Sequence, residues 1–352
     1  MKKGLTRNER TVLYGLAKYP TLNDRGLSER TGVKHSTITA IRRRLHQEGY
    51  FKTVRIPAVS RLGYELAVVG YGRYNPSADG ELRKRFLDTL KRENKGLYYF
   101  LTSPDFFLFM SASKNYTSFR RWAEKLEFEF SDTNLFCNST KTWVVFPFGT
   151  ARLVRHFDYS RALSLLFGIE EKIAAEATFK KLQARRLTKK ERTVLKGLVD
   201  YPEFTDVALS ERVDASRQVI SSMKKRFERA GLIRTARVVD LGKVGYSIYS
   251  FVHMMHSSKT PLKSRMEGVR RTLEIAPVFF TSIGNTESIW CSAYRDYEEF
   301  SGARKALGPL CAGREHVVGR PEIELVALSE ADVPVNCDFS NIIGEALDGA
   351  PR

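Results

Sequence analysis

Two short segments of the chain carry side chains that can hydrogen-bond to base edges and phosphates. The first has serine and threonine hydroxyls from Ser36 onward, followed by the run Arg42-Arg43-Arg44. Short hydroxyl side chains allow a close approach to a groove, and arginine reaches the flanking phosphates. The second segment has Arg217 and Gln218 near its start. Arginine pairs bidentately with guanine and glutamine with adenine, so the chemistry of both segments is directed at nucleic acid.

Each segment is predicted to form a helix with an apolar face turned inward. Apolar side chains recur at i, i+3 and i+7 in both: Ile38, Ile41 and Leu45 in 36–48, and Ile220, Met223 and Phe227 in 216–230. The predicted DNA contacts lie on the other faces and just before them: Lys34, His35, Ser36, Thr37, Thr39, Arg42, Arg43, Arg44, Ser216, Arg217, Gln218, Ser221, Ser222, Lys224 and Lys225. Because the two polar faces differ, we expect them to read unlike half-sites.

The elements around these helices predict a winged helix-turn-helix domain in each case. In the first, Thr6 and Glu9 have capping-box spacing before the apolar helix 6–17, and 27–31 leads into the turn Gly32-Val33. In the second, 209–213 leads into the turn Asp214-Ala215. A β-rich segment follows each third helix, at 50–57 and 232–239, and its basic residues are predicted to line a wing: Lys52, Arg55, Arg234 and Arg237.

The two domains are copies of one sequence. Residues 6–64 align without a gap to 188–246, and 22 of the 59 aligned positions are identical. A period this long exceeds that of solenoid repeats, so a whole multi-element subunit is duplicated. We call residues from 6 onward copy one and residues from 188 onward copy two, and we expect the chain to be a covalent pseudo-dimer.

Charge supports a polyanionic partner. Residues 1–61 contain 14 Lys and Arg against 4 Asp and Glu, and 185–239 contain 14 against 7, so these windows carry +10 and +7 of the net charge of +18. Helix-turn-helix domains also serve as protein-interaction modules, and an arginine run can simply be a solvated face. Concentration of charge in both copies favours double-stranded DNA over these alternatives.

A second repeated module follows each winged helix. In copy one the predicted order is strand 66–74, helix 79–94, strands 97–102 and 106–112, helix 116–128 and strand 134–146. In copy two it is strand 246–256, helix 261–275, strands 278–283 and 288–294, helix 297–307 and strand 316–328. This βαββαβ order predicts a ferredoxin-like domain. The fold class expected is therefore α+β, with two winged helices alternating with two βαββαβ domains.

A winged helix followed by a βαββαβ domain resembles the Lrp/AsnC (feast/famine) family of transcription regulators, over nearly the whole chain twice. The residues that carry the resemblance are 27–33, Ile38, Ile41, Arg44, Leu45, Glu48, Gly49, Ile56-Pro57 and Leu62-Gly63-Tyr64. The resemblance implies a sequence-specific DNA-binding regulator. It also implies that the two βαββαβ sheets pair within the chain, that chains can associate further as a homodimer, and that a small effector such as an amino acid binds at such domains.

The effector loop departs from the family pattern. In that family, a glycine-containing loop with a nearby Asp usually follows the second strand of the βαββαβ domain. Copy two has Gly284, Asn285 and Glu287 there, and these are the predicted effector contacts, although Gly284 fits a hairpin turn as well. Copy one has Ser103-Pro104 instead, and proline removes a backbone donor.

Siroheme decarboxylases resemble the same two-domain plan and give an alternative function, that of a tetrapyrrole enzyme. Such an enzyme needs basic and imidazole side chains, and four histidines are available: His156, His253, His256 and His316. None of them sits in a recognised motif, and we find no phosphate loop, HExxH or nucleophile motif. The expectation from sequence is therefore that the chain is not an enzyme and needs no cofactor.

The remaining composition is that of an ordinary soluble protein. The longest apolar runs are shorter than the roughly 18 residues of a membrane span, and Cys137, Cys291, Cys311 and Cys337 form no CxxC pair, so we expect a cytoplasmic protein without metal. The expected domains are two winged helices at 1–61 and 187–243, two βαββαβ domains at 62–150 and 244–328, a helical connector at 151–186 and an acidic tail at 329–352.

Overall fold

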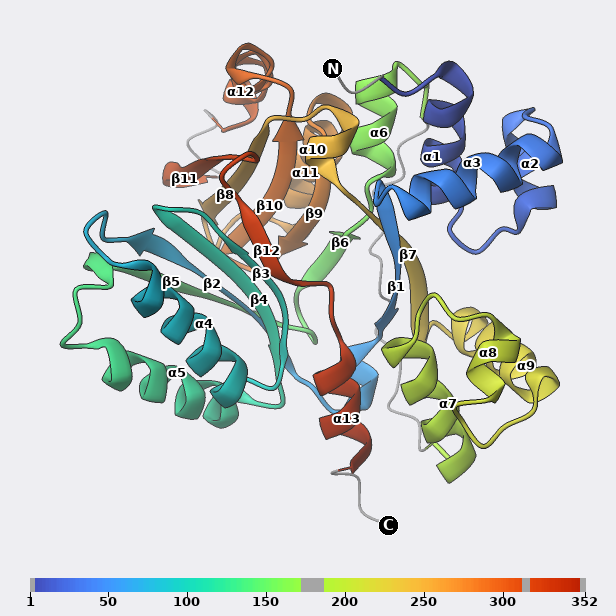
Figure 1. Ribbon diagram of the computed structural model, residues 1–352. Helices are drawn as coiled ribbons and strands as arrows, with labels where there is room; N and C mark the ends of the chain where they lie inside the picture. The colour runs from blue at the N-terminus through green and yellow to red at the C-terminus, as the bar shows by residue number, and fades with distance from the viewer. Residues whose placement is uncertain (1–3, 172–186, 312–316, 349–352) are drawn as a thin grey trace. The chain divides into compact units, whose positions relative to one another are not determined.

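The computed structural model describes residues 4–171, 187–311 and 317–348, which form two compact units. Unit 1 comprises residues 1–53, 151–180 and 235–329, and unit 2 comprises 54–150, 181–234 and 330–352. Each unit therefore combines the winged helix of one copy with the βαββαβ module of the other (Figure 1). The α+β class with two alternating modules is confirmed.

The helix-turn-helix cores form as the sequence predicts. Capping boxes at Thr6/Glu9 and Thr188/Glu191 open the first helix of each copy. The third helices begin and end within one residue of the expected bounds. The six helices are α1 (Arg7–Lys18), α2 (Asp24–Thr31), α3 (His35–Gln47), α7 (Lys189–Asp200), α8 (Asp206–Ser210) and α9 (Arg217–Arg229).

The expected wings are not separate. Strand β1 (Phe51–Pro57) of copy one and strand β7 (Ile233–Val239) of copy two pair with each other in a two-stranded sheet. A short helix then leads from each strand into the βαββαβ module, η1 (Val59–Leu62) in copy one and α10 (Leu241–Val244) in copy two. Both short helices end at a glycine with positive φ, Gly63 at 90° and Gly245 at 116°, where a side chain would be strained.

Unit 2 contains the copy-one βαββαβ module, whose strands run in the order β3-β4-β2-β5 with every neighbour antiparallel. Both helices of the module lie on the same face of this sheet (Figure 1). The elements are β2 (Leu66–Tyr74), α4 (Gly80–Glu93), β3 (Leu97–Thr102), β4 (Phe106–Ser113), α5 (Tyr116–Phe130) and β5 (Phe136–Pro147).

Unit 1 contains the copy-two module with the same topology, in the strand order β11-β8-β10-β9. The βαββαβ prediction is thus confirmed in both copies. The elements are β8 (Ile248–His256), α11 (Leu262–Ile275), β9 (Val278–Ile283), β10 (Glu287–Tyr294), α12 (Tyr297–Cys311) and β11 (Val317–Ala327).

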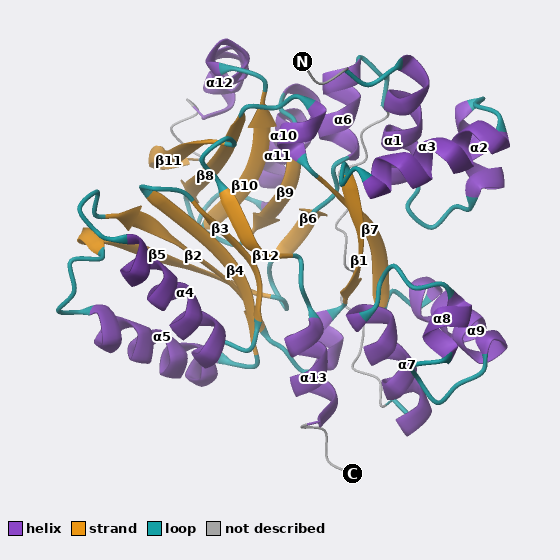
Figure 2. Ribbon diagram, viewed as in Figure 1, coloured by secondary structure: helices purple, strands orange, loops and turns teal. Residues whose placement is uncertain are grey.

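Each sheet gains a fifth strand from the copy to which it does not belong. Strand β6 (Arg152–His156), which follows the copy-one module, pairs with β9, and β12 (Asp332–Asn336), which follows the copy-two module, pairs with β3 (Figure 2). Helices α6 (Ser160–Phe167) and α13 (Ser340–Asp348) come next. The segment expected as a helical connector therefore begins with a strand, and the acidic tail contains both a strand and a helix.

The two exchanged helices hold a winged helix against a sheet. Helix α6 packs on α1 and β9 in unit 1, and α13 packs on α7 and β3 in unit 2. Tyrosines at equivalent positions contact these helices: Tyr246 Oη donates to the Ala162 carbonyl of α6 at 2.7 Å, and Tyr64 Oη donates to the Glu345 carboxylate of α13 at 2.7 Å. Among the described residues, no helix combines the length and the apolar character that crossing a membrane requires.

Aromatic rings fill the space between helices and sheet in the copy-one module. Tyr74, Phe86, Phe107 and Phe136 are mutual neighbours, with ring centroids 5.1 to 6.4 Å apart. Edge-to-face and tilted arrangements of this kind add to the gain from burying the rings. This cluster, together with Phe100 and Phe130, forms the aromatic part of the hydrophobic core of the copy-one module in unit 2.

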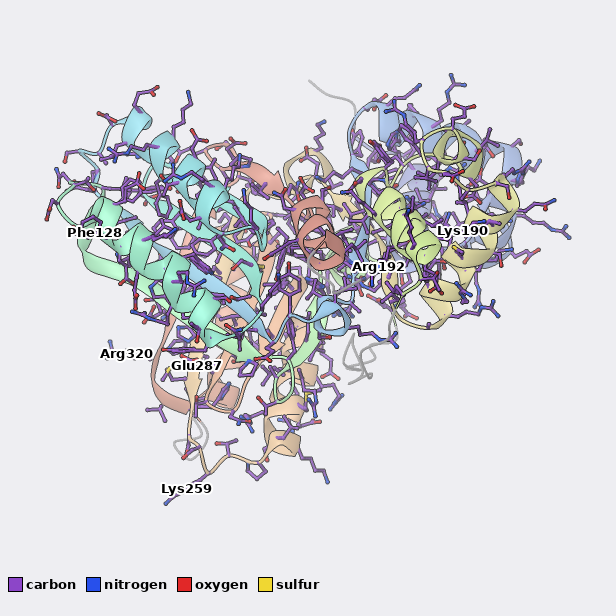
Figure 3. All side chains as sticks on the ribbon, turned by 90° about the horizontal axis from the view of Figure 1, so that it is seen from below. Phe128, Lys190, Arg192, Lys259, Glu287 and Arg320 are labelled. Atoms are coloured by element: carbon purple, nitrogen blue, oxygen red, sulfur yellow. The ribbon has the colours of Figure 1, made fainter. Side chains whose placement is uncertain are left out.

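Substituting Phe107, whose ring is 2% exposed, should destabilise unit 2. We expect Phe107→Ser to lower the free energy of unfolding by about 3–5 kcal/mol, because it removes a buried ring and leaves a cavity. Urea unfolding followed by tryptophan fluorescence measures this in a Trp290→Phe background, where the remaining two tryptophans are both in unit 2. Phe128, 86% exposed on α5 (Figure 3), provides the control: Phe128→Ser should change stability by less than about 0.5 kcal/mol. Equal effects of the two substitutions would contradict the assigned core.

Candidate functional site

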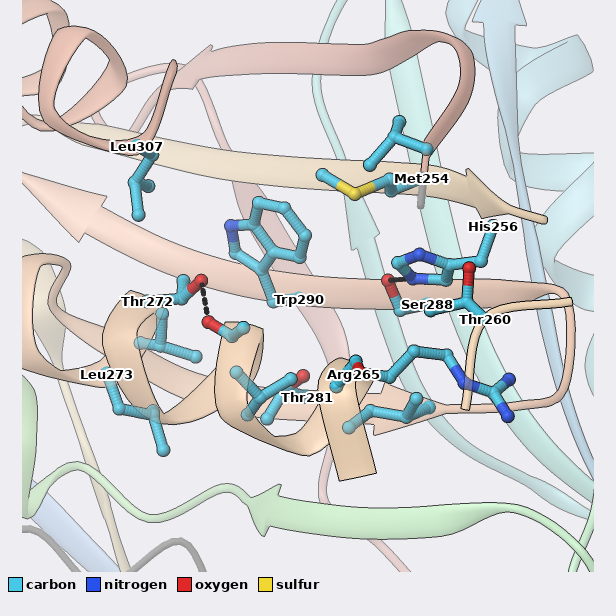
Figure 4. A pocket seen from close by; sticks show the side chains of 16 residues that line it. Met254, His256, Thr260, Arg265, Thr272, Leu273, Thr281, Ser288, Trp290 and Leu307 are labelled. Carbon is cyan, nitrogen blue, oxygen red and sulfur yellow. Dashed lines mark hydrogen bonds between the residues drawn. The ribbon is translucent and has the colours of Figure 1, made fainter. Parts of the chain in front are cut away.

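A cavity of about 90 Å³ lies in unit 1 between α11 and the sheet of the copy-two module (Figure 4). This volume accommodates several water molecules or part of a larger ligand. The walls are mainly apolar and include Met254, Val269, Leu273, Ile283 and Trp290. The polar side chains are His256, Thr260, Ser264, Arg265, Thr272, Thr281 and Ser288. We call it the α11 pocket.

The α11 pocket exists because copy two lacks the aromatic cluster of copy one. The strand registers show which positions of the two modules are equivalent. Gly72 pairs with Phe107 in copy one, and Met254 pairs with Ser288 in copy two, so Phe107 corresponds to Ser288. The shared Thr-Leu step in α4 and α11 aligns the helices. On this alignment smaller or more polar side chains replace the rings of copy one: Tyr74 by His256, Phe86 by Val269, Phe100 by Thr281, Phe107 by Ser288 and Phe136 by Val317.

Four polar groups gather at one end of the pocket: His256, Thr260, Arg265 and Ser288 (Figure 4). His256 Nε2 lies 2.7 Å from Ser288 Oγ, on adjacent strands (Figure 4). Arg265, on α11, donates to the carbonyl of Gly284 at 2.6 Å and also to that of Asn285, so its guanidinium holds the β9–β10 hairpin. Within the described part of the chain, the lining includes no aspartate or glutamate. The pocket therefore suits an apolar or anionic group and offers no carboxylate to an amino group.

The predicted effector loop does not line this pocket. The Gly284 amide donates to the Glu287 carbonyl at 2.7 Å, so the loop is a tight hairpin turn, as the alternative interpretation of Gly284 held. Glu287 lies 3.4 Å from His253 on the opposite face of the sheet. The carbonyls of Gly284 and Asn285 are linked to the pocket through Arg265, and that of Thr286 accepts from the His256 amide at 2.6 Å.

Of the four histidines considered from sequence, one lines the pocket. His256 does so, whereas His253 alternates with it along β8 and points to the other face. His156 is buried against Phe157 and Phe280. His316 lies outside the described residues. Within the described part of the chain, no group of three or more metal-ligating side chains occurs.

The predicted DNA contacts of α3 divide into two groups. Three of them hold the helix in place: Arg42 pairs with Asp24 at 2.8 Å, Thr39 donates to the same carboxylate at 2.6 Å, and Arg44 pairs with Glu9. Their partners lie on α1 and α2, and Glu9 and Asp24 are buried. The exposed residues that remain on the outward face are Lys34, His35, Ser36 and Arg43, with Thr37 half-buried.

Helix α9 repeats this division at equivalent positions. Arg226 pairs with buried Glu191 at 2.6 Å, as Arg44 does with Glu9, and Lys224 lies 3.7 Å from Asp206, as Arg42 lies beside Asp24. The outward residues are Ser216, Arg217, Gln218, Ser222 and Lys225, all exposed, with Ser221 half-buried. We call the two ion pairs of each copy the helix clamps. The clamps orient α3 and α9 and leave their outward faces different.

The predicted wing arginines need a correction. Arg55 is 4% exposed and donates to the Leu198 carbonyl at 3.0 Å, and burial lowers the pKa of its guanidinium. Arg237, at the equivalent position, is half-buried and donates to Thr53 Oγ1 and, at 3.4 Å, to the Pro20 carbonyl. These two arginines serve the β1–β7 ribbon. Lys52 is exposed and Arg234 half-buried.

Comparison with known proteins shows which fold spans the whole chain. No protein-family model matches it, and no curated sequence is detectably similar. The solved structure of the siroheme decarboxylase NirDL is similar over 97% of this chain and 99% of its own, with a TM-score of 0.53 and 12% identity. The structure of NirDL in co-complex with an iron-uroporphyrin III analogue is similar over 96% of this chain and 98% of its own, with a TM-score of 0.52 and 12% identity. AsnC from E. coli covers 40% of this chain and 93% of its own, with a TM-score of 0.31 and 16% identity.

The full-length similarity to an enzyme overturns the expectation that the chain is not an enzyme. That expectation rested on the lack of a catalytic motif and on the charge of the winged helices. Neither feature separates an enzyme on this plan from a regulator, because a fold similar over both copies occurs in an enzyme. At 12% identity the similarity is one of fold.

Proposed function

We propose that the chain is a decarboxylase of a polycarboxylated substrate of the tetrapyrrole class, with the α11 pocket as the place of reaction. The observation that carries the proposal is the correspondence of both copies, over their full length, with an enzyme solved in complex with an iron-uroporphyrin III analogue. The pocket supports it independently, because one copy has opened a cavity where the other is packed with aromatic rings.

The chemistry of the pocket suits loss of carbon dioxide. A carboxylate placed among apolar walls loses hydration, which favours its conversion to neutral carbon dioxide. The bond from the carboxyl carbon to the side-chain carbon breaks, and its electron pair passes to that carbon and the conjugated ring. The imidazolium form of His256, hydrogen-bonded to Ser288, then gives a proton to that carbon in place of the carboxyl group and is left as neutral imidazole.

Size limits what enters the pocket. Cavities that enclose a drug-sized ligand measure about 300–1,000 Å³, whereas the α11 pocket measures about 90 Å³. It therefore admits one carboxylate-bearing side chain, and the macrocycle stays outside. The requirement for a reactive group on a short arm is consistent with a substrate whose carboxylates hang from a ring.

The decarboxylase proposal predicts a specific effect of His256→Gln. The wild-type protein should release carbon dioxide from siroheme or iron-uroporphyrin III, and the variant should do so about 10²–10⁴-fold more slowly, because its side chain cannot donate a proton as an acid. Mass spectrometry of the product measures the loss of carbon dioxide from the substrate. His35→Gln, on the exposed face of α3, should leave the rate unchanged. If the wild-type protein neither binds nor decarboxylates siroheme, and neither binds nor decarboxylates iron-uroporphyrin III, the proposal is wrong.

A second candidate function is sequence-specific DNA binding through α3 and α9, as the sequence predicts. The observation that favours it is the pair of helix clamps, which hold both helices with exposed, basic and unlike outward faces. The two sheets would pair within the chain, so that it acts as a pseudo-dimer on a non-palindromic site. This function does not exclude the enzymatic one, because it uses other residues.

DNA binding predicts different outcomes for clamp and outward residues. Arg217→Ala or Gln218→Ala should reduce the preference for particular bases by about 1–3 kcal/mol. Arg43→Ala should weaken binding to all DNA sequences alike. Arg44→Ala should instead lower stability, because the buried Glu9 carboxylate loses its cationic partner and keeps only the capping-box hydrogen bond to the Thr6 amide. Selection of genomic fragments at two salt concentrations, with sequencing, measures the preference, and affinity should fall by about 0.9 log unit per log unit of salt for each phosphate contacted. No retention at low salt would contradict DNA binding.

A further inference from the structure

A second cavity, of about 190 Å³, lies in unit 2 at the end of the sheet where β4 leads into α5. Its lining comes from the loop between α4 and β3, from the first turns of α5, and from α13. The residues on which the inference rests are Asn94, Lys95, Lys114, Arg121, Trp122 and Lys125. We call it the α5 pocket. It is lined by more polar surface than the α11 pocket and shares no residue with it.

Two buried donors of the α5 pocket have no acceptor among the described residues. Asn94 is 2% exposed, and its Oδ1 accepts from the Gly96 amide at 3.1 Å, which fixes the orientation of the side-chain amide. Its Nδ2 is left without a hydrogen bond, as is Nε1 of Trp122, which is 7% exposed. Buried donors are nearly always satisfied in folded proteins, so two in one cavity indicate a missing acceptor.

The charged side chains around the pocket indicate which charge the missing acceptor carries. Lys114 is paired with Glu345 at 2.9 Å, and Lys125 with Glu93 at 2.9 Å. Lys95 and Arg121 form no ion pair with any described residue. Both pocket carboxylates are therefore neutralised, while two cations at the rim remain uncompensated, and an anion is favoured over a cation.

We propose that the α5 pocket binds an oxyanion, the carboxylate or phosphate group of a small molecule. An oxyanion has only acceptors, which match the N–H groups of Asn94 and Trp122 and the cationic side chains of Lys95 and Arg121. Charge-assisted bonds of this kind are about twice as strong as neutral ones. The proposal is independent of the decarboxylase function, because the pocket lies in the other unit.

Copy two lacks this arrangement. Helices α5 and α12 both begin at a tyrosine, which aligns Arg121 with Gly302, Trp122 with Ala303 and Lys125 with Ala306. The loop that supplies Asn94 is two residues shorter in copy two, between Thr272-Leu273 and Val278, than between Thr89-Leu90 and Leu97. The donors are thus not required by the fold, since the same fold forms without them.

The three tryptophans of the chain allow a direct test. Trp122 lies at the α5 pocket, Trp290 lines the α11 pocket, and Trp143 donates to Glu127 at 3.0 Å and serves as an internal reference. In protein labelled with ¹⁵N-tryptophan, each indole N–H gives one resonance, assigned by the Trp→Phe variants. Phosphate, acetate and chloride are titrated separately at constant ionic strength.

Binding should move the Trp122 indole resonance downfield and leave that of Trp143 in place, because only the first gains an acceptor. A shift with phosphate alone identifies a phosphate site, and a shift with acetate alone a carboxylate site. The double variant Lys95→Gln, Arg121→Gln, in exposed residues, should weaken the affinity about tenfold or more. Lys84→Gln, which replaces an exposed lysine on α4 outside the pocket, should leave the affinity unchanged. A Trp122 resonance unmoved by either oxyanion, or moved equally in the double variant, overturns the proposal.

Discussion

The exchange of one edge strand between the two copies is the interaction on which the rest of the structure depends. A βαββαβ sheet in the order β3-β4-β2-β5 leaves β3 at its edge with a row of unpaired backbone groups. Strand β12, from the end of copy two, pairs with that edge, and β6, from the end of copy one, pairs with β9. The helix after each strand then binds a winged helix, α6 to α1 and α13 to α7. Neither module can complete its sheet or seat its winged helix without the other half of the chain.

This dependence explains why the copies can diverge without separating. Backbone pairing at the exchanged edges tolerates many side chains, so each module is free to change its interior. Copy one keeps a dense aromatic core around Phe86 and Phe107, whereas copy two has opened the α11 pocket at the same depth. Copy one in turn carries the α5 pocket, for which copy two has no counterpart. A duplicated chain has in this way acquired two unlike cavities on one plan.

The sequence was sufficient for the fold but not for the site. Repeat alignment, capping boxes and apolar periodicity predicted the winged helices and the order of both modules, because these depend on local spacing. The exchange of β6 and β12 could not be predicted, since five-residue strands in a presumed connector and tail give little signal. The α11 pocket depends on what is missing, such as a ring at Ser288 or Val269, and it becomes visible only when the registers align the two copies. His256 was considered for its type, but nothing in its sequence neighbours distinguished it from His253.

Comparison between the copies also separates the arginines that hold the winged helices together from those that face outward. Arg44 and Arg55 have identical counterparts in Arg226 and Arg237, and all four are used to hold the fold together. The outward positions differ instead: in the alignment of the two copies, Ser36 corresponds to Gln218 and Arg43 to Lys225. Within a duplicated chain, identity at a charged position therefore indicates a contact that both copies need to fold. Difference at an exposed position gives the two copies unlike surfaces, and the proposed reading of a non-palindromic site rests on that difference.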